Sequence, residues 1–596
     1  MNSLHQFHIP VMGLAYTIDS PVKVARYGIA STISIVEDKL VELMRLHYYR
    51  ERKDTYTPIT PREDDYRAKR ITDYLNLVNK MVQEQIEQLK ASAFETGSEI
   101  SKYFEMLPTS SSVRQLYQQI IQAGGEVKTL QDFLRSQIVP GAIDVNIMTK
   151  LDKDNSNKEG EVIAETSDAL AALRGYAKSD LTNSSIIFSA GLNPRLFNYL
   201  EKLPAFNATG FGKFDKRIVI KVSDYRSAII QGKYLAKKGL WVSEFRIESG
   251  LNCGGHAFAS DGFLLGPILE EFKTKKEELI QTLFQLYNPA VQTKGGETFD
   301  QPHPINITVQ GGIGTAEEAD FLIEHYGVTS AGWGTPFLLC PEATTVDNVT
   351  LNQLSLAKEE DVILSKFSPL GVRFNYLKGS SAEKEKQRRI DKGSPGSPCT
   401  EKHLVSNTEF TKEPICTASH KYQKLKINQL KEQNLPEAEY IARYNEVVGK
   451  ECLCVGLSNS ASMKYGVPFI KNRTDVNICP GPNIAYFHKI VSLKEMTDHI
   501  YGRTNILSTT KRPHMFIKEL DLNIDYVKEQ ISNLNKMDGK QTKDATKYIV
   551  NLIEGIEYYK VLSLSMFKEN ISEPFTFLNT ILERENDLKK LQSKLV

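Results

Sequence analysis

The sequence predicts an α/β protein built on a (β/α)8 TIM barrel, with a long helical insertion between strands 2 and 3 and a mostly helical C-terminal region. Three observations support this fold class. Strand-like runs alternate with helix-like stretches from the N-terminus to about residue 340, which is typical of a parallel sheet or barrel. These runs number eight, as a closed barrel needs. The last two open into glycine-bearing turns one βα unit apart.

The predicted strands are short runs rich in apolar residues. They are Ile9–Leu14, Ile29–Val36, Ile143–Thr149, Ser185–Ala190, Arg217–Val222, Leu240–Ile247, Ile305–Gln310 and Gly327–Gly334. The choice of eight rests in part on the family resemblance given below.

An insertion at about 51–137 separates the second and third strands by roughly a hundred residues more than a βα connection needs. Residues 63–107 are predicted to be helical because apolar residues recur three or four positions apart. These residues are Ile71, Leu75, Val78, Val82, Ile86 and Leu89. The insertion is interpreted either as a lid or dimer surface on the strand-end side or as a packing subdomain away from the site. The sequence leaves both open.

The chain is predicted to divide into a barrel domain at 1–378, a connector at 379–402 and a C-terminal region at 403–596. The connector is charged and rich in Gly, Pro and Ser, which is typical of an exposed turn or linker. Acidic residues interrupt its basic run, favouring a solvated helix face over a nucleic-acid site. The C-terminal region is expected to be helical beyond Leu493 and irregular at Cys479.

Composition excludes several classes of protein. In 596 residues, 41% are hydrophobic and 25% are charged, as in soluble globular proteins of two or more domains. The 74 Lys and Arg residues balance 73 Asp and Glu residues, so no overall bias toward nucleic acid or anionic membrane exists. The N-terminus does not resemble a signal peptide, and no apolar run is long enough for a bilayer. We therefore expect a cytoplasmic protein without a membrane partner.

Seven cysteines are too few for a disulfide scaffold in a chain of this length. Five of them lie close together in the sequence: Cys399, Cys416, Cys452, Cys454 and Cys479. Their spacing matches none of the common ligand patterns. We therefore expect no metal site, although the sequence alone does not decide whether these five bind a metal.

Two glycine-bearing turns suggest a phosphate clamp. Gly311 and Gly312 follow one predicted strand, and Gly334 and Thr335 follow the next. Residues without a bulky Cβ let main-chain N–H groups close around a dianion, and the helix after Gly314 adds the positive end of its dipole. The loops after strands 7 and 8 of a (β/α)8 barrel often hold phosphate in this way.

A second motif follows the predicted strand Leu240–Ile247. Its residues Gly254, Gly255 and His256 place an imidazole at the mouth of the barrel, beside backbone that can approach a planar ligand closely. Histidine titrates near neutrality, so His256 is suited to proton abstraction or donation.

Together these segments resemble the nitronate monooxygenases, once called 2-nitropropane dioxygenases, and related FMN-dependent barrel enzymes. The resemblance covers about residues 8–378 without the insertion. The matching pieces include HIPVMGLAYTIDSPVKVARYGI, DVNIMT, IKVSDYRSAIIQGKYLAKKG, NCGGHAF, VQGGIGTAEEA and GWGTPFLLCPEAT. The enoyl-reductase-like subunits of polyunsaturated fatty-acid and polyketide synthases are larger relatives that carry similar extra helical sequence.

The resemblance implies an FMN site and assigns its residues. Met12 and Gly13 match the strand end against the flavin, and Asn146 matches an asparagine on strand 3. Lys221 matches a polar residue that reaches the flavin, where a cation stabilises negative charge on the reduced ring. Gly254 and Gly255 would form the turn beside the cofactor. Gly311, Gly312, Gly334 and Thr335 would hold its phosphate, and His256 matches the base.

The chain departs from the family pattern at two places, so the substrate of its relatives is not assigned to it. Relatives usually have Glu-Ala before Gly-Gly-His, whereas this chain has Asn252 and Cys253. The insertion and the C-terminal region have no counterpart in compact nitronate enzymes. The reaction, the electron donor or acceptor and the oligomeric state therefore stay undetermined, and a homo-oligomer is left open.

Three functions were weighed. The first is an FMN-dependent oxidoreductase acting on a small molecule such as a nitronate, with enoyl-thioester reduction as an alternative. The second is a flavin enzyme acting on a macromolecule such as RNA, with residues 420–426 and 482–490 as docking segments, although we do not expect a nucleic-acid partner. The third is a non-catalytic protein that has kept a barrel.

Overall fold

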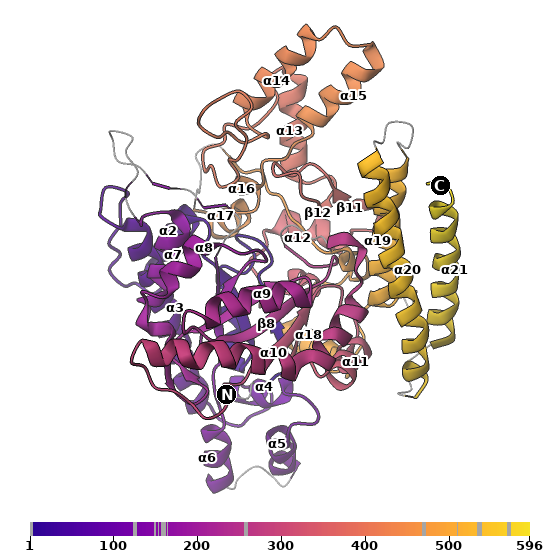
Figure 1. Ribbon diagram of the computed structural model, residues 1–596. Coiled ribbons are helices and arrows are strands. Elements are labelled where there is room, and N and C mark those ends of the chain that lie inside the picture. Colours follow the sequence, from indigo (N-terminus) through magenta and orange to yellow (C-terminus); the bar gives the residue numbers. More distant parts are fainter. Residues whose placement is uncertain are drawn as a thin grey trace.

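The computed structural model describes residues 4–122, 128–147, 151–152, 154–155, 163, 165–254, 260–467, 473–508, 511–532, 539–568 and 574–595. Eight parallel strands form a closed barrel in the order β1-β10-β9-β8-β7-β4-β3-β2 (Figure 1). They are β1 (Phe7–Ile9), β2 (Ala30–Ser34), β3 (Ile143–Ile147), β4 (Ser185–Phe188), β7 (Arg217–Val222), β8 (Val242–Glu248), β9 (Asn306–Gln310) and β10 (Ser330–Gly332). The predicted fold class is confirmed, with one strand in each of the eight predicted regions.

The first strand differs from the prediction of Ile9–Leu14. It spans Phe7–Ile9, where Trp333 N donates to His8 O (3.0 Å). Pro10 ends it because proline has no N–H for the next rung of the ladder. Met12 and Gly13 therefore lie in the loop after the strand, at the C-terminal end of the barrel.

Two short antiparallel hairpins were not predicted. One joins β5 (Ala208–Gly210) to β6 (Lys213–Phe214), and the other joins β11 (Val362–Ser365) to β12 (Phe374–Leu377). The second follows the last barrel strand and leads into the C-terminal region.

The interior of the barrel is polar and ionic. Arg246 on β8 lies 3.5 Å from Asp144 on β3, and these strands are not neighbours, so the contact crosses the barrel interior. Glu244 accepts hydrogen bonds from Arg246 (2.7 Å) and Thr308 (2.6 Å). Burial raises the pKa of Asp144, although the Arg246 charge opposes this shift. Charged pairs thus occupy an interior that branched aliphatic residues usually fill.

Helices surround the barrel and bury one face against it. These are α1 (Ser20–Val24), α2 (Asp38–Glu51), α7 (Asp168–Ala177), α8 (Pro194–Leu200), α9 (Tyr225–Ala236), α10 (Leu265–Thr293), α11 (Ala316–Tyr326) and α12 (Asn348–Ser355). Side-chain caps fix several of their starts, as where Asp224 accepts from Ser227 N at the start of α9.

The insertion forms α3 (Tyr66–Ala91), α4 (Glu99–Met106), α5 (Ser112–Gln122) and α6 (Lys128–Ser136). The predicted apolar positions of α3 are buried, and α3 packs against α2 and α7 as part of the outer layer. Tyr103 of α4 lies beside Gly28, which precedes β2, at the N-terminal face of the barrel. α5 and α6 extend from the end of the molecule where the N-terminus lies (Figure 1). The lid interpretation is therefore wrong for α4–α6, which lie opposite the strand ends.

The C-terminal part of the chain is helical beyond Leu493, as predicted. Its helices are α13 (Ser381–Asp391), α14 (His420–Glu432), α15 (Glu437–Val448), α16 (Leu453–Gly456), α17 (Asn459–Tyr465), α18 (Leu493–Ile500), α19 (Met515–Ile531), α20 (Gly539–Lys568) and α21 (Pro574–Gln592). The connector is not a linker throughout, because Ser380 caps α13 within it. Residues 393–419, all described, contain only isolated bridges and turns.

The barrel and the C-terminal helices share one hydrophobic core. Ile484, Phe487, Met515 and Leu520 are buried in the same cluster as the barrel strands. The two halves are also joined by hydrogen bonds, from Ala15 N to Leu457 O (3.1 Å) and between His5 Nδ1 and Tyr501 OH (2.7 Å). Among the helices that the structure describes, none combines the length and apolar character needed to cross a bilayer.

Candidate active site at the barrel mouth

Glu248 is the centre of a polar cluster where β7, β8 and β9 end. Its Oε1 lies 3.2 Å from Lys221 Nζ and accepts hydrogen bonds from Gln310 Nε2 (2.9 Å) and Asn252 Nδ2 (2.8 Å). The Lys221 side chain is 11% exposed and that of Glu248 is 21% exposed. This cluster, Lys221, Glu248, Asn252 and Gln310, is called the mouth cluster below.

Two further polar side chains lie at the ends of β2 and β3. Ser34 and Asn146 are partners in the parallel register, so their side chains point to the same side. Both are buried, and neither Ser34 Oγ nor Asn146 Oδ1 has a hydrogen-bond partner in the structure. An unpaired buried acceptor costs about 1–3 kcal/mol. These atoms are therefore suited to receive hydrogen bonds from a bound molecule or from water.

Glycines with positive φ frame the mouth: Gly13 (124°), Gly254 (78°), Gly311 (105°) and Gly312 (86°). A Cβ on Gly254 would lie 2.4 Å from the carbonyl carbon of Met12, so only glycine permits this approach. The predicted residues Met12, Gly13 and Gly254 are thus in contact. Gly255 and His256 lie outside the described residues.

The space between the two predicted clamp turns is filled by the protein itself. A Cβ on Gly311 would lie 2.9 Å from Asn252 N, and one on Gly312 would lie 2.6 Å from Leu251 Cδ1. Gly334 faces Cys253, with 3.1 Å from its Cβ position to the cysteine Cβ. The loop after β8 therefore packs directly on both turns.

A segment from the C-terminal region covers the same place. The Cβ position of Gly481 lies 2.5 Å from Leu251 O and 2.7 Å from Thr335 Oγ1, and Cys479 O accepts from Gly254 N (2.9 Å). Asn483 donates to the carbonyls of Gly312 (2.7 Å) and Ile313 (2.9 Å). Residues 482–487 are buried here, so this part of the predicted docking segment 482–490 belongs to the barrel mouth, whereas residues 488–490 are exposed.

Arg512 binds the turn that precedes α11. Its guanidinium donates to Gly312 O (2.6 Å), Asn483 Oδ1 (3.0 Å) and Glu318 Oε1 (2.8 Å). Glu318 in turn accepts from Gly314 N (2.9 Å), so one of the amides expected to face phosphate already has a partner. The Arg512 and Glu318 side chains are 4% and 3% exposed. The turn before α11 therefore carries a buried ion pair in this structure.

Glu519 of α19 fixes the loop that carries His256. It accepts hydrogen bonds from Leu265 N (2.8 Å) and from the main-chain N–H of Gly250, which lie on either side of that loop. Burial raises the pKa of Glu519 to about 7, despite these two hydrogen bonds. An acidic side chain from the C-terminal region thus holds both ends of the loop after β8.

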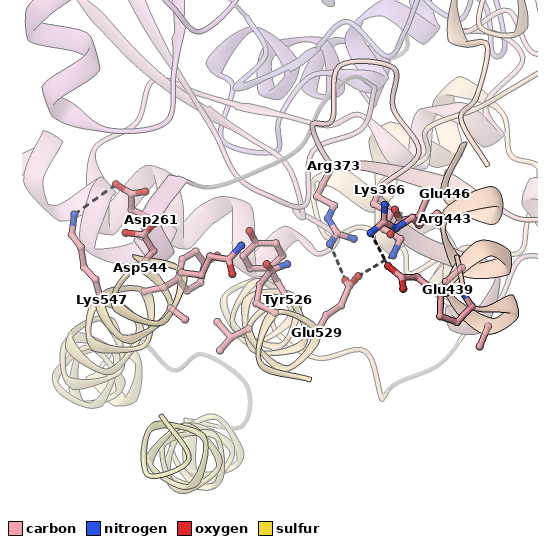
Figure 2. A pocket seen from close by; sticks show the side chains of 18 residues that line it. Asp261, Lys366, Arg373, Glu439, Arg443, Glu446, Tyr526, Glu529, Asp544 and Lys547 are labelled. Carbon is pink, nitrogen blue, oxygen red and sulfur yellow. Dashed lines mark hydrogen bonds and ion pairs between the residues drawn. The ribbon is translucent and has the colours of Figure 1, made fainter. Parts of the chain in front are cut away.

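A cleft of about 1610 Å³ adjoins this loop. Asp261, Lys366, Arg373, α15, α19 and α20 line it (Figure 2). Its charges pair with one another, as in Arg373–Glu529 (2.9 Å) and Asp261–Lys547 (4.0 Å). We therefore assign no ligand to this cleft.

Sequence reasoning missed Glu248, Gln310 and Arg512. The first two had a signal, because each is a polar residue at the C-terminal end of a predicted strand, where barrel enzymes place their functional groups. Arg512 had no local signal. Its role depends on a contact with residues about 200 positions earlier.

None of the known family models and none of the curated proteins matches the chain. Among solved structures, it is similar to the enoyl reductase domain of MlnA from the macrolactin biosynthesis cluster of Bacillus amyloliquefaciens. The two share 14% sequence identity over 71% of this chain and 88% of that domain, with a TM-score of 0.31. A likeness of this size does not define the reaction, which must be argued from the site.

Proposed function

We propose that this protein is an FMN-dependent oxidoreductase with its active site at the C-terminal mouth of the barrel. The observation that carries the proposal is the mouth cluster with the unpaired acceptors of Asn146 and Ser34 beside it. A cation, a carboxylate and amides converge where barrel enzymes bind their ligands. The sequence resemblance names FMN as the group that such a mouth accepts.

The residues fit FMN at one end of the site. Lys221 and Asn146 provide a cation and an acceptor for the polar edge of the ring, and Met12 and Gly13 provide close backbone beside it. Bound FMN supplies electron and hydride transfer. Lys221 forms an ion pair with Glu248. The mouth therefore has no excess positive charge where a polar ring would bind.

The phosphate end does not fit in the arrangement described. Leu251, Cys253 and Gly481 fill the space between Gly312 and Thr335. FMN binding there requires the loop after β8 to leave both turns, together with the segment around Gly481. Arg512 would then remain at the turn as a buried cation, two of whose five N–H groups are not used in its three hydrogen bonds to the protein.

Proton transfer is assigned to His256, on the sequence resemblance alone. Glu519 binds the described residues on either side of the histidine segment, Gly250 and Leu265. A His256→Ala variant should keep the flavin and lose proton-transfer chemistry. Full activity in that variant would remove this role.

The substrate is either a small molecule such as a nitronate or an acyl thioester with a conjugated double bond. A nitronate would give electrons to oxidised flavin and bleach it under anaerobic conditions. An enoyl thioester would instead take hydride from reduced flavin and restore its absorbance. A single anaerobic assay with both substrates separates these two reactions.

The binding proposal is tested by flavin content and by FMN titration. Gly312→Ala should lower FMN affinity at least tenfold because a Cβ enters the clamp turn. Gly327→Ala is the matched control, since Gly327 also has positive φ (67°) but caps α11 with nothing within 4 Å of its Cβ position. Equal affinity in the two variants would contradict the assigned phosphate site.

A second pair of variants tests the ring end of the site. Lys221→Met should weaken FMN binding and flavin reduction, whereas Lys213→Met, at an exposed position on β6, should change neither. A protein that binds no FMN under any condition would favour a non-catalytic barrel. The non-catalytic barrel is the second candidate function because protein atoms fill the predicted phosphate clamp.

A further inference from the structure

Four cysteines from two separate parts of the C-terminal region meet in space. Cys399 and Cys416 belong to the irregular segment 393–419, and Cys452 and Cys454 lie at the start of α16. All four line one small cavity of about 10 Å³. All seven cysteines of the chain lie in the described ranges, and none forms a disulfide. The structure thus assembles a thiol cluster that the spacing in the sequence did not predict.

Each of the four sulfur atoms faces a main-chain N–H. The amide of Lys402 donates to Cys399, that of Ala418 to Cys416, that of Val455 to Cys452 and that of His403 to Cys454. In three cases the donor is two or three residues after the cysteine. Hydrogen bonds from amides favour the thiolate, the form that binds metal and whose hydrogen bonding tunes metal–sulfur centres.

The backbone around Cys399 adopts an uncommon conformation. Cys399 (φ 53°) and Lys402 (φ 60°) both lie in the left-handed region, which costs a side-chain-bearing residue about 1–3 kcal/mol. The segment 393–419 has no helix or strand of its own, and irregular segments of this length are uncommon in compact proteins. A bound metal centre would supply the missing anchor, because metal binding contributes directly to folding.

The surroundings of the cluster are apolar. Phe374, Tyr376, Leu404 and Leu453 form a second hydrophobic core together with Cys416 and Cys454. Within this apolar setting the thiols of Cys399 and Cys416 are hydrogen-bonded to each other. Coordination would deprotonate all four thiols and satisfy their charge at this buried position.

A neighbouring group, Glu37, Glu401 and His403, also has the composition of a metal site. Its donor atoms lie within 4.8 Å of one another. However, Glu37 already accepts from His403 (2.5 Å) and from Lys39 N (3.0 Å), and Glu401 pairs with Lys39 (2.7 Å). Each carboxylate thus already has partners in the protein, so we assign no metal to this group.

We propose that Cys399, Cys416, Cys452 and Cys454 together bind a thiolate-ligated metal centre. Soft thiolates select zinc or iron–sulfur clusters over hard cations. A tetrahedral zinc ion with bonds of about 2.3 Å would bring its sulfur atoms to roughly 3.8 Å from one another. No three of these cysteines lie within 4.8 Å of one another in the described structure. A single ion would therefore require the thiols to draw together, and Cys399 and Cys416, which are hydrogen-bonded to each other, already provide one close pair.

Metal analysis of the full-length protein, purified without oxygen from cells supplied with iron and zinc, tests the proposal. Iron with matching acid-labile sulfide and visible absorbance identifies a cluster, and about one zinc per chain without sulfide identifies a single ion. Either result supports the four-cysteine site. Metal content below a tenth of an equivalent, before and after reconstitution with ferrous iron and sulfide or with zinc, would overturn it.

Serine variants locate the site. Cys399→Ser, Cys416→Ser, Cys452→Ser and Cys454→Ser should each reduce bound metal at least tenfold. Cys340→Ala is the matched control, because Cys340 is fully buried in the other core and should leave metal content unchanged. An equal loss in the control would contradict the assignment.

Thiol labelling of the unmodified protein avoids variants that do not fold. In the metal-loaded protein, Cys399 should resist alkylation and become reactive when a chelator is added, as detected by mass spectrometry of its peptide. Rapid alkylation of Cys399 in the purified protein, unchanged by chelator, would overturn the proposal.

Discussion

Glu519 shows how one buried residue couples the C-terminal region to the barrel mouth. It is 2% exposed, and this burial disfavours its ionised form. Its two accepted hydrogen bonds favour ionisation but do not compensate for burial. The folded protein therefore binds this proton more tightly than the unfolded chain does.

This shift predicts a pH-dependent stability. The pKa of Glu519 rises from 4.5 to about 7 on folding, so the free energy of unfolding should decrease as pH rises through that range. The full loss, reached above pH 7, is on the order of 3 kcal/mol. Glu519→Gln should remove this part of the slope. Urea unfolding at several pH values between 5 and 8 measures it.

The matched control for this prediction is Glu554→Gln, which changes an exposed carboxylate on α20. Its pH dependence should follow that of the unmodified protein. If Glu519→Gln and Glu554→Gln gave the same slope, the buried carboxyl would not be the group that titrates.

At the scale of single residues, the sequence predicted those site residues that a pattern in the neighbouring sequence marks. Gly13, Gly254, Gly311 and Gly312 lie in the loops that follow barrel strands, and all have the positive φ that glycine supplies. Arg512 and Glu519 are ordinary charged residues near or within a predicted helix. Their function depends on contacts that form only in the folded chain. The spacing of apolar residues along the sequence does not predict such contacts.

The start of α11 illustrates the same dependence for a secondary-structure element. Thr315 caps the helix by accepting from Glu318 N (3.2 Å), while Glu318 reaches back to Gly314 N (2.9 Å). Arg512 and Met515 N then bind Glu318 from the C-terminal region, each at about 2.8 Å or less. The helix start and the segment before α19 therefore form one hydrogen-bonded unit.

Breaking this unit should be costly. Arg512→Met leaves the Glu318 carboxylate buried without its counter-ion, which we expect to destabilise the protein by about 3–5 kcal/mol. The double variant Arg512→Met with Glu318→Gln should be clearly less destabilised, because no charge remains unpaired. Urea unfolding of both proteins at pH 7 gives the comparison.

Arg584→Met provides the control for an exposed ion pair. Arg584 and Asp521 are 30% and 27% exposed, and losing such a pair should cost less than about 1 kcal/mol. A similar cost for Arg512→Met and Arg584→Met would mean that burial does not strengthen the Arg512 contact.

The sequence predicted which helices and strands exist better than it predicted where they end or where they lie in the fold. Each of the eight predicted regions contains a barrel strand because short apolar runs mark them and because the family resemblance helped to select them. The first strand was predicted too far toward the C-terminus because its apolar run continues through Pro10. The missing N–H of Pro10 ends the hydrogen bonding between strands at that point. The helices of the insertion were also found, but not their place at the N-terminal face, since periodicity shows which side of a helix is buried and not what covers it.

At the scale of the whole molecule, the barrel and the C-terminal region are joined by shared core contacts. Both contribute to the larger hydrophobic core, and the mouth contains residues from each. We therefore predict one calorimetric transition for the full chain. We also expect residues 1–378 alone to be insoluble or to lack a cooperative transition, since they would expose the apolar surface that Ile484 and Phe516 cover.

Two separate transitions, or a stable and soluble fragment, would contradict this prediction. Either outcome would support the division into independent domains that the sequence suggested.

The hydrogen bond between His5 and Tyr501 spans 496 residues, and this separation affects how the protein is made. A ribosome adding about 5–20 residues per second would need roughly 25–100 s to produce Tyr501 after His5. During that interval the first strand lacks this partner, and the mouth lacks the segment that covers it. Nascent chains should therefore remain open to chaperones and proteases until the last helices emerge from the ribosome.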